Sequence, residues 1–156
     1  MPVLVGRHVN RIDRKGRVSV PKTFRDYLQA QGGFLGAYAY GLINEPGIEG
    51  CGESFMTRVA ESVERLGMFS DDHDEFALAL LESAHQLPFD PEGRITLPAE
   101  LIEHAGLQAE VLFVGRGSRF QIWNPSTYQQ HRNELVDRLR SRGATLKLAP
   151  AAEEQR

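Results

Sequence analysis

The sequence predicts a β-rich α+β fold in which two similar halves interleave as a pseudo-dimer within one chain, with helices at the flanks. The first observation is an internal repeat: Asp13–Pro21 reads DRKGRVSVP and Asp90–Pro98 reads DPEGRITLP, an offset of 90 − 13 = 77 residues. The second is that each copy lies in the same order of predicted elements: strand, turn, strand, helix and hairpin. One half cannot bury its strands alone, so each half is expected to lend strands to the other.

The first half opens with a strand, the repeated turn, a second strand and a helix. Loosely alternating apolar residues predict a strand over 3–12. In the turn, Gly16 supplies a positive φ at little steric cost, and Val18–Val20 then predicts a short strand. Pro21 fits the first turn of a helix, where a missing N–H costs nothing, and Gly32 ends that helix.

A hairpin and an outer helix complete this half. Phe34–Tyr40 alternates and predicts a strand of the hairpin. Gly41–Gly52 is rich in glycine but has no phosphate-binding spacing, so we expect a mobile loop there. The following helix carries its apolar residues on one face: Phe55, Val59, Val63 and Leu66. Packing against the core is the preferred role of this face, and contact with a neighbouring subunit is the alternative.

The second half repeats this order. Its strands are predicted over 82–89, 95–97, 110–115 and 120–123. Pro98 opens a helix and Gly106 ends it. Asn124 caps a long outer helix, and Pro125 fits its first turn. The apolar residues of that outer helix are Tyr128, Leu135, Val136 and Leu139, and for it too packing against the core is preferred over contact with a neighbouring subunit.

These elements divide the chain into a first half over 1–69, a second half over 70–142 and a flexible tail over 143–156. Between the halves, Ser70 precedes four acids and a histidine in 71–75. A metal site is one interpretation of this cluster. A helix N-terminus is favoured, because serine caps a helix and acids in the first turn suit its dipole. Loops that bind hard metals need a glycine turn and spaced carboxylates.

The positive charge of the chain is concentrated at its beginning. The net charge is −3, which argues nothing for nucleic acid. Residues 1–25 nevertheless carry seven cations against Asp13 alone. These cations are Arg7, Arg11, Arg14, Lys15, Arg17, Lys22 and Arg25. Such asymmetry points to a polyanion partner for one face, and a basic solvated surface is the alternative.

The two turns share a scaffold but differ in surface. In each, an aspartate and an arginine four residues apart can pair across the bend. The residues assigned to this structural turn motif are Asp13, Gly16, Asp90, Gly93 and Arg94. The first copy adds Arg14 and Lys15, where the second has Pro91 and Glu92, so only the first suits phosphate contact. Arginine also matches guanine edges in the major groove. The DNA-binding candidates are therefore Arg17, Lys15, Arg14, Arg7 and Arg11.

Other functions find less support in the residues. Two aspartates in a repeat are compatible with an acid protease, but Asp13 and Asp90 each face an arginine that disfavours a shared proton. The five histidines show no ligand spacing, and Cys51 has no basic activator nearby in sequence. We expect no catalysis, metal, cofactor or small-molecule substrate. No apolar run spans a bilayer and no signal peptide is visible, which favours the cytoplasm.

The twin motifs at Asp13–Pro21 and Asp90–Pro98 resemble the signatures of the MraZ family of bacterial transcriptional regulators. The stretch from Ala105 to Asn124 is also similar to the second half of that family. The resemblance implies two AbrB-like swapped-hairpin halves that form a double-split β-barrel. It places DNA contact in the first-half turn, at Arg14, Lys15 and Arg17.

The resemblance also implies a biological role. MraZ proteins control a cell-division and cell-wall gene cluster, usually as repressors, by binding repeated G-rich boxes of double-stranded DNA at their own promoter. They assemble into rings, so weak contacts add by avidity. The expected protein is a nucleoid-associated homo-oligomer in the cytoplasm. An AbrB-like antitoxin or protein-interaction module is the alternative.

Overall fold

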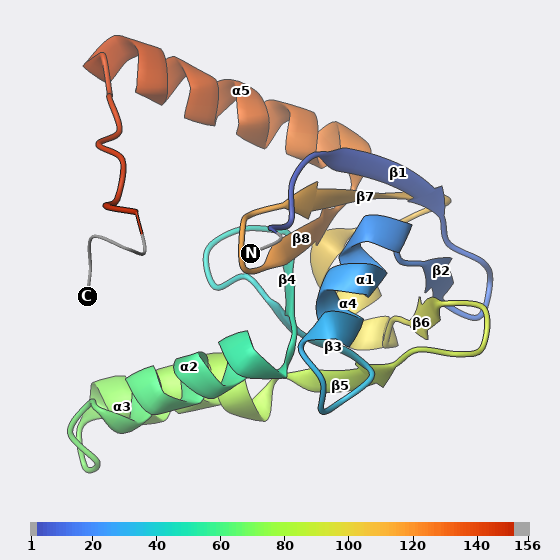
Figure 1. Ribbon diagram of the computed structural model, residues 1–156, viewed down its shortest axis with the longest axis horizontal. Coiled ribbons are helices and arrows are strands. Elements are labelled where there is room, and N and C mark those ends of the chain that lie inside the picture. Colours follow the sequence, from blue (N-terminus) through green and yellow to red (C-terminus); the bar gives the residue numbers. More distant parts are fainter. Residues whose placement is uncertain (1–2, 152–156) are drawn as a thin grey trace.

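The computed structural model describes residues 3–151 and shows an α+β fold built on a mainly antiparallel sheet (Figure 1). Its strands run in the order β1-β7-β8-β4-β3-β5, and β2 and β6 form a separate two-stranded ribbon. The strands are β1 (Arg7–Arg11), β2 (Arg17–Ser19), β3 (Gly36–Gly41), β4 (Ile48–Cys51), β5 (His85–Pro88), β6 (Arg94–Thr96), β7 (Glu110–Gly115) and β8 (Phe120–Trp123).

Most strand pairings join the two halves of the chain. β1 pairs with β7, β3 with β5, β2 with β6 and β4 with β8, all antiparallel. Only the hairpins β3–β4 and β7–β8 pair within a half. The six-strand order also reads the same when the two halves are exchanged. Each half thus supplies partners for the strands of the other, as the repeat predicted.

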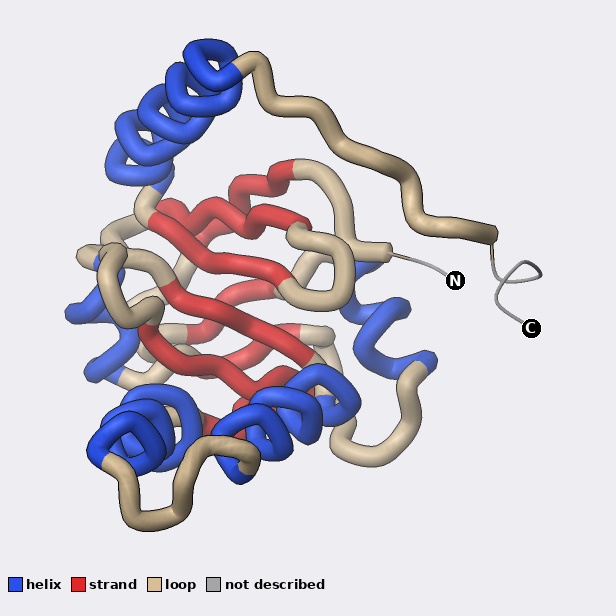
Figure 2. Tube along the Cα trace, turned by 90° about the vertical axis from the view of Figure 1, so that its left-hand side faces the viewer, coloured by secondary structure: helices blue, strands red, loops and turns tan. Residues whose placement is uncertain are grey.

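The helices are distributed around this sheet (Figure 2). They are α1 (Lys22–Ala30), α2 (Glu53–Glu64), α3 (Asp71–Phe76), the π-helical turn η1 (Ala77–Glu82), α4 (Ala99–Ala105) and α5 (Pro125–Arg142). The predicted caps are present. Ser70 Oγ accepts a hydrogen bond from the N–H of His73, Asn124 Oδ1 accepts one from Ser126, and Gly106 is left-handed.

The core lies between the sheet, the β2–β6 ribbon, and helices α1 and α4. Phe24 of α1 meets Phe113 edge-on, with ring centroids 6.2 Å apart, and meets Phe120 at 5.6 Å. Val18 and Ile95, which face each other across the ribbon, are both fully buried. Burying such apolar side chains supplies most of the free energy of folding, so the ribbon is fixed to the core from beneath.

One prediction about the first half is wrong. The expected mobile loop over Gly41–Gly52 contains strand β4, which is buried on both faces. Its glycines are there because large rings lie against them. A Cβ built on Gly50 would overlap the ring of Phe120, and one on Gly47 would overlap the indole of Trp123. Only the segment between β3 and β4 is a turn, closed by a bond from Leu42 N–H to the carbonyl of Gly47.

The outer helices also differ from the prediction of core packing. Helix α2 packs against α3 and η1, and together they extend from the sheet as a helical hairpin (Figure 1). Helix α5 is anchored at Tyr128, but its second half projects away, and Leu139 is 53% exposed. Ala144–Ala151 forms neither helix nor strand, while 152–156 of the predicted tail lie outside the described residues. No helix in the described part is long and apolar enough to cross a membrane.

Candidate nucleic-acid interface

Each repeated turn is built around its aspartate. Asp13 Oδ1 accepts hydrogen bonds from the N–H groups of Lys15 and Arg17, both at 2.9 Å, and its Oδ2 accepts one from Arg17 Nε at 2.7 Å. These bonds, led by the one from the Arg17 backbone, hold the pKa of Asp13 below its usual value. A carboxylate locked in this way fixes both the turn and the direction of the arginine side chain.

The second turn has the same geometry. Asp90 Oδ1 accepts from the N–H groups of Glu92 and Arg94 at 2.9 Å, and Oδ2 accepts from Arg94 Nε at 2.7 Å. The pKa of Asp90 is likewise lowered, first by the Arg94 backbone. Since both aspartates are engaged by their own arginines and stay ionised, the arrangement opposes the shared proton that an acid protease requires.

Both turns need glycine at their fourth position. Gly16 has φ +83° and Gly93 has φ +77°, a region that L side chains rarely adopt. Gly16 also approaches the other half closely, because its carbonyl accepts a hydrogen bond from Leu97 N–H at 2.8 Å. A Cβ on Gly16 would lie 2.8 Å from the carbonyl oxygen of Leu97. In the same way the carbonyl of Gly93 accepts a hydrogen bond from Val20 N–H at 3.2 Å, so each turn is tied to the residue that follows the ribbon strand of the other half.

The ribbon β2–β6 joins the two turns through one exposed face. Arg17 lies opposite Thr96, and Ser19 lies opposite Arg94. Since side chains alternate along a strand, these four share the face away from the buried Val18. Ser19 and Thr96 are exposed on it, and residue pattern alone did not indicate them as part of the site. A two-stranded ribbon has dimensions that the DNA major groove admits.

The two ends of this face differ in free charge. Arg14 and Lys15 are exposed, and within the described residues no carboxylate lies within ion-pair distance of either. Arg17 is held through Nε, so the hydrogen bond to Asp13 does not use its two terminal nitrogens. At the other end, Arg94 meets Asp90 and also Glu92, whose carboxylate lies 3.6 Å from Nη2. Among the residues of the two turns themselves, the surplus positive charge thus belongs to the first turn.

The remaining candidates lie on β1. Arg11 is exposed next to this turn, but it sits opposite Glu110 of β7 in the register. Arg7 lies opposite Val114, four residues earlier and about 13 Å away along the strand. The structure therefore groups Arg14, Lys15 and Arg17, places Arg11 at their edge, and leaves Arg7 apart.

Arg25, counted in the basic segment, has a different position. Its Nε donates a hydrogen bond to the carbonyl of Val20 at 3.0 Å, and its guanidinium lies against Gly93. It supports the second turn from within the protein.

Among the described residues, no group of three or more histidines, cysteines and carboxylates is placed to hold a metal ion.

Comparison with known proteins places this scaffold in a family. A family model described as "MraZ protein, putative antitoxin-like" matches residues 80–146. A transcriptional regulator MraZ of Parvibaculum lavamentivorans is 47% identical over 124 residues, covering 79% of this chain and 76% of the relative. The chain belongs to the MraZ family. A MraZ regulator of Beijerinckia indica is 38% identical over 152 residues, covering 97% of this chain and 92% of its own length.

A third MraZ regulator, from Rickettsia canadensis, is 39% identical over 133 residues, or 85% of this chain and 89% of the relative. The likeness over 152 of the 156 residues spans both halves, including the first turn. Relatives of this family bear the name of a transcriptional regulator, which is not an enzyme class.

Proposed function

We propose that this protein is a sequence-specific DNA-binding transcriptional regulator that contacts DNA through its first turn. The observation that carries the proposal is the asymmetry between two turns of one geometry. Arg14 and Lys15 present unpaired charge, and the orientation of Arg17 is set by Asp13. Lysine and arginine at a turn contact phosphates and fix the register, while an oriented guanidinium reads a guanine edge through two parallel bonds.

The finer features of the proposal follow the family. The regulator acts as a repressor of a cell-division and cell-wall gene cluster and binds repeated G-rich boxes in its own promoter. It works in the cytoplasm, at the nucleoid. Its two halves, 1–69 and 70–142, form a pseudo-dimeric swapped-hairpin barrel, a relationship supported by the exchange of strands between them. Several copies assemble into a ring, so that individually weak contacts on neighbouring boxes add.

Fluorescence anisotropy tests the proposal. DNA from upstream of the gene for this protein is compared with scrambled DNA across a salt series. Specific binding is expected, with a slope of roughly −0.9 per neutralised phosphate. Arg17→Ala should lower the affinity for the upstream DNA by about tenfold or more, equivalent to one bidentate base contact of about 1–3 kcal/mol.

The matched control is Arg94→Ala, which removes the equivalent arginine from the second turn, where Glu92 and Asp90 both lie close. Circular dichroism verifies that both variants fold. Equal, weak binding of the wild type to both DNAs would reject the proposal. The alternative is an antitoxin or protein-interaction module, and copurification of a stoichiometric small protein without specific DNA binding would favour it.

A further inference from the structure

We infer that helix α5 of one copy docks into the apolar groove of a second copy, between α2 and the α3–η1 segment. This contact would join copies of the chain head to tail. The inference rests on the proposed assembly into homo-oligomers and identifies the surfaces that form it. Two features of the chain support it: an apolar groove on the hairpin and a helix whose apolar side is exposed.

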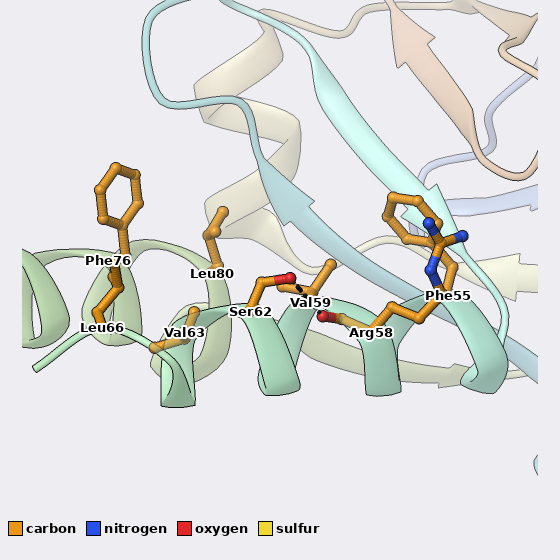
Figure 3. Close-up of a pocket in the computed structure, with 8 residues that line it drawn as sticks. All are labelled: Phe55, Arg58, Val59, Ser62, Val63, Leu66, Phe76 and Leu80. Atoms are coloured by element: carbon orange, nitrogen blue, oxygen red, sulfur yellow. Dashed lines mark hydrogen bonds between the residues drawn. The ribbon is translucent and has the colours of Figure 1, made fainter. Parts of the chain in front are cut away.

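The groove runs along the helical hairpin (Figure 3). It has a volume of about 260 Å³. Its lining is apolar apart from two polar residues of α2. The lining residues are Phe55, Arg58, Val59, Ser62, Val63, Leu66, Phe76 and Leu80. Phe76, the last residue of α3, lies at the far end of the groove and is 40% exposed. An open apolar channel of this kind, on a hairpin that projects from the sheet, is typical of a surface that takes a helix.

Helix α5 is anchored at its beginning. The ring of His131 stacks on Trp123 at 4.6 Å, and Tyr128 is buried beside the same indole. Beyond this anchor, Leu135 and Leu139 continue on the same side as Tyr128, since residues seven and four apart share a helix face. They form a shallow apolar surface with the stems of Arg138 and Arg142.

The repeat shows what this open side lacks. Helices α2 and α5 follow equivalent strands, β4 and β8, and begin at equivalent places: 125 − 53 = 72 and 120 − 48 = 72 residues apart. In the first half the chain returns as α3 and η1 and packs along α2. After α5, the chain described up to Ala151 returns no helix to that side (Figure 1). A groove from a second copy supplies the missing contact.

The charges of the two surfaces are complementary. The hairpin 53–82 carries eight carboxylates against two arginines, and four of the acids lie in α3, beside the open end of the groove. Helix α5 carries four arginines against two carboxylates, with three of the arginines in its last five residues. With Leu135 and Leu139 in the groove, Arg138 and Arg142 come towards the acidic first turn of α3. Like charges at this point would oppose the docking.

The two surfaces are different, so a copy that offers its α5 to one neighbour still has a free groove for another. Such a heterologous contact produces a closed ring when the rotation between copies closes, and an open filament when it does not. Each copy then holds its first turn in the same relation to the assembly. This arrangement lets several first turns meet successive DNA boxes.

Sedimentation velocity of the full chain without DNA tests the docking. The wild type should assemble, and Leu139→Glu and Phe76→Glu should each raise the concentration needed for assembly by about tenfold or more, or about 1.4 kcal/mol per contact. Gln130→Glu, on the opposite side of α5, and Leu78→Glu, exposed on the hairpin but outside the groove, should assemble like the wild type. Leu139→Ser and Phe76→Ser replace any glutamate variant that fails to fold.

Mixing the two defective variants gives the sharper result. The intact groove of Leu139→Glu should bind the intact α5 of Phe76→Glu, so the mixture should form heterodimers that neither variant forms alone. A monomeric wild type, normal assembly of Leu139→Glu, or a mixture without heterodimers would each overturn the docking. Anisotropy with the upstream DNA separates the two proposals. Specific binding by a monomeric protein would support the proposed regulator and reject the docking. Assembly of a protein that binds both DNAs equally would support the docking and reject the proposed regulator.

Discussion

Arg25 of α1 lies over Gly93 in the second turn in the way that Ile102 of α4 lies over Gly16 in the first. The two covering residues are themselves equivalent, since 102 − 25 = 77 is the offset of the repeat. Each turn is therefore capped by a helix from the other half. The side chain that covers the second turn is a cation, so this positive charge serves the fold, whereas under the proposed function the charges of the first turn serve DNA contact.

Substitution of Arg25 and of Lys15 should separate these uses. Arg25→Ala removes the hydrogen bond to Val20 and should lower the free energy of unfolding by about 1–2 kcal/mol. It should leave the salt slope of DNA binding unchanged. Lys15→Ala removes an exposed cation and should reduce that slope by about 0.9 without changing stability. Urea unfolding and anisotropy across a salt series measure both effects, and identical behaviour of the two variants would contradict the division.

Gly16→Ala should be more destabilising than Gly32→Ala. Both glycines are left-handed, at φ +83° and +73°, so both variants acquire backbone strain of about 1–2 kcal/mol. Only at Gly16 would the new methyl group also meet backbone, the carbonyl of Leu97, whereas nothing lies within 4 Å at Gly32. We expect a further loss of about 1–2 kcal/mol in the unfolding free energy of Gly16→Ala. Equal losses would show that the turn does not approach the other half so closely.

Because of the Cys51 thiol, the free energy of unfolding should fall as the pH rises above 9. Burial raises its pKa from 9.0 to about 12. Because the folded value exceeds the unfolded one, its contribution is complete below pH 9 and is lost as the pH rises towards 12. In this window the unfolding free energy should fall by about 1.4 kcal/mol per pH unit for this one proton. Burial of Tyr40 raises its pKa as well, so part of the wild-type decline has that origin.

Cys51→Ala isolates the thiol. Its unfolding free energy should fall less steeply than that of the wild type between pH 9 and 10.5, whatever the two values are at pH 7. Thiol labelling provides an independent measurement, since the buried side chain should react only when the protein opens. Parallel pH profiles for the two proteins would show that the thiol does not titrate differently on unfolding.

His131→Ala should release the start of α5. The substitution removes the ring stacked on Trp123 and the contact of 3.3 Å between His131 Nε2 and Glu45. The loss should be about 0.5–1.5 kcal/mol of stability. Trp123 is the only tryptophan, so a shift of its fluorescence reports the change directly. Gln130→Ala, one position earlier and exposed, should leave the spectrum unaltered, and a shift there would show that any change in α5 disturbs Trp123.

The repeat, together with the prolines and glycines that begin and end its helices, predicted much of the fold. Pro21, Pro98 and Gly106 mark the ends of α1 and α4, because their backbone preferences act locally. Strand β4 could not be found in this way. Its glycines look like a loop until β8 is placed beside them, and their partners Phe120 and Trp123 lie about seventy residues further along the chain. The local residue pattern does not predict tertiary contacts of this kind.

In the candidate site, too, the local pattern predicted some residues and missed those that only tertiary contacts bring there. Charge and motif pointed to Arg14, Lys15 and Arg17 because one turn holds them all. The sequence did not indicate that Ser19 and Thr96 share their face, since that follows from the register of β2 against β6. Nor did it separate Arg25 from the other cations, because its contact with Gly93 joins residues far apart in the chain.

The exchange of strands between halves also affects how the chain emerges from the ribosome. Strand β1 ends at Arg11, and its partner β7 begins at Glu110, which is 110 − 11 = 99 residues later. At about 5–20 residues per second, synthesis leaves β1 waiting for about 5–20 seconds. During that time the nascent first half exposes unpaired strand edges, which are templates for misassociation with other nascent chains. The complete sheet can therefore form only after β7 and β8 have left the exit tunnel.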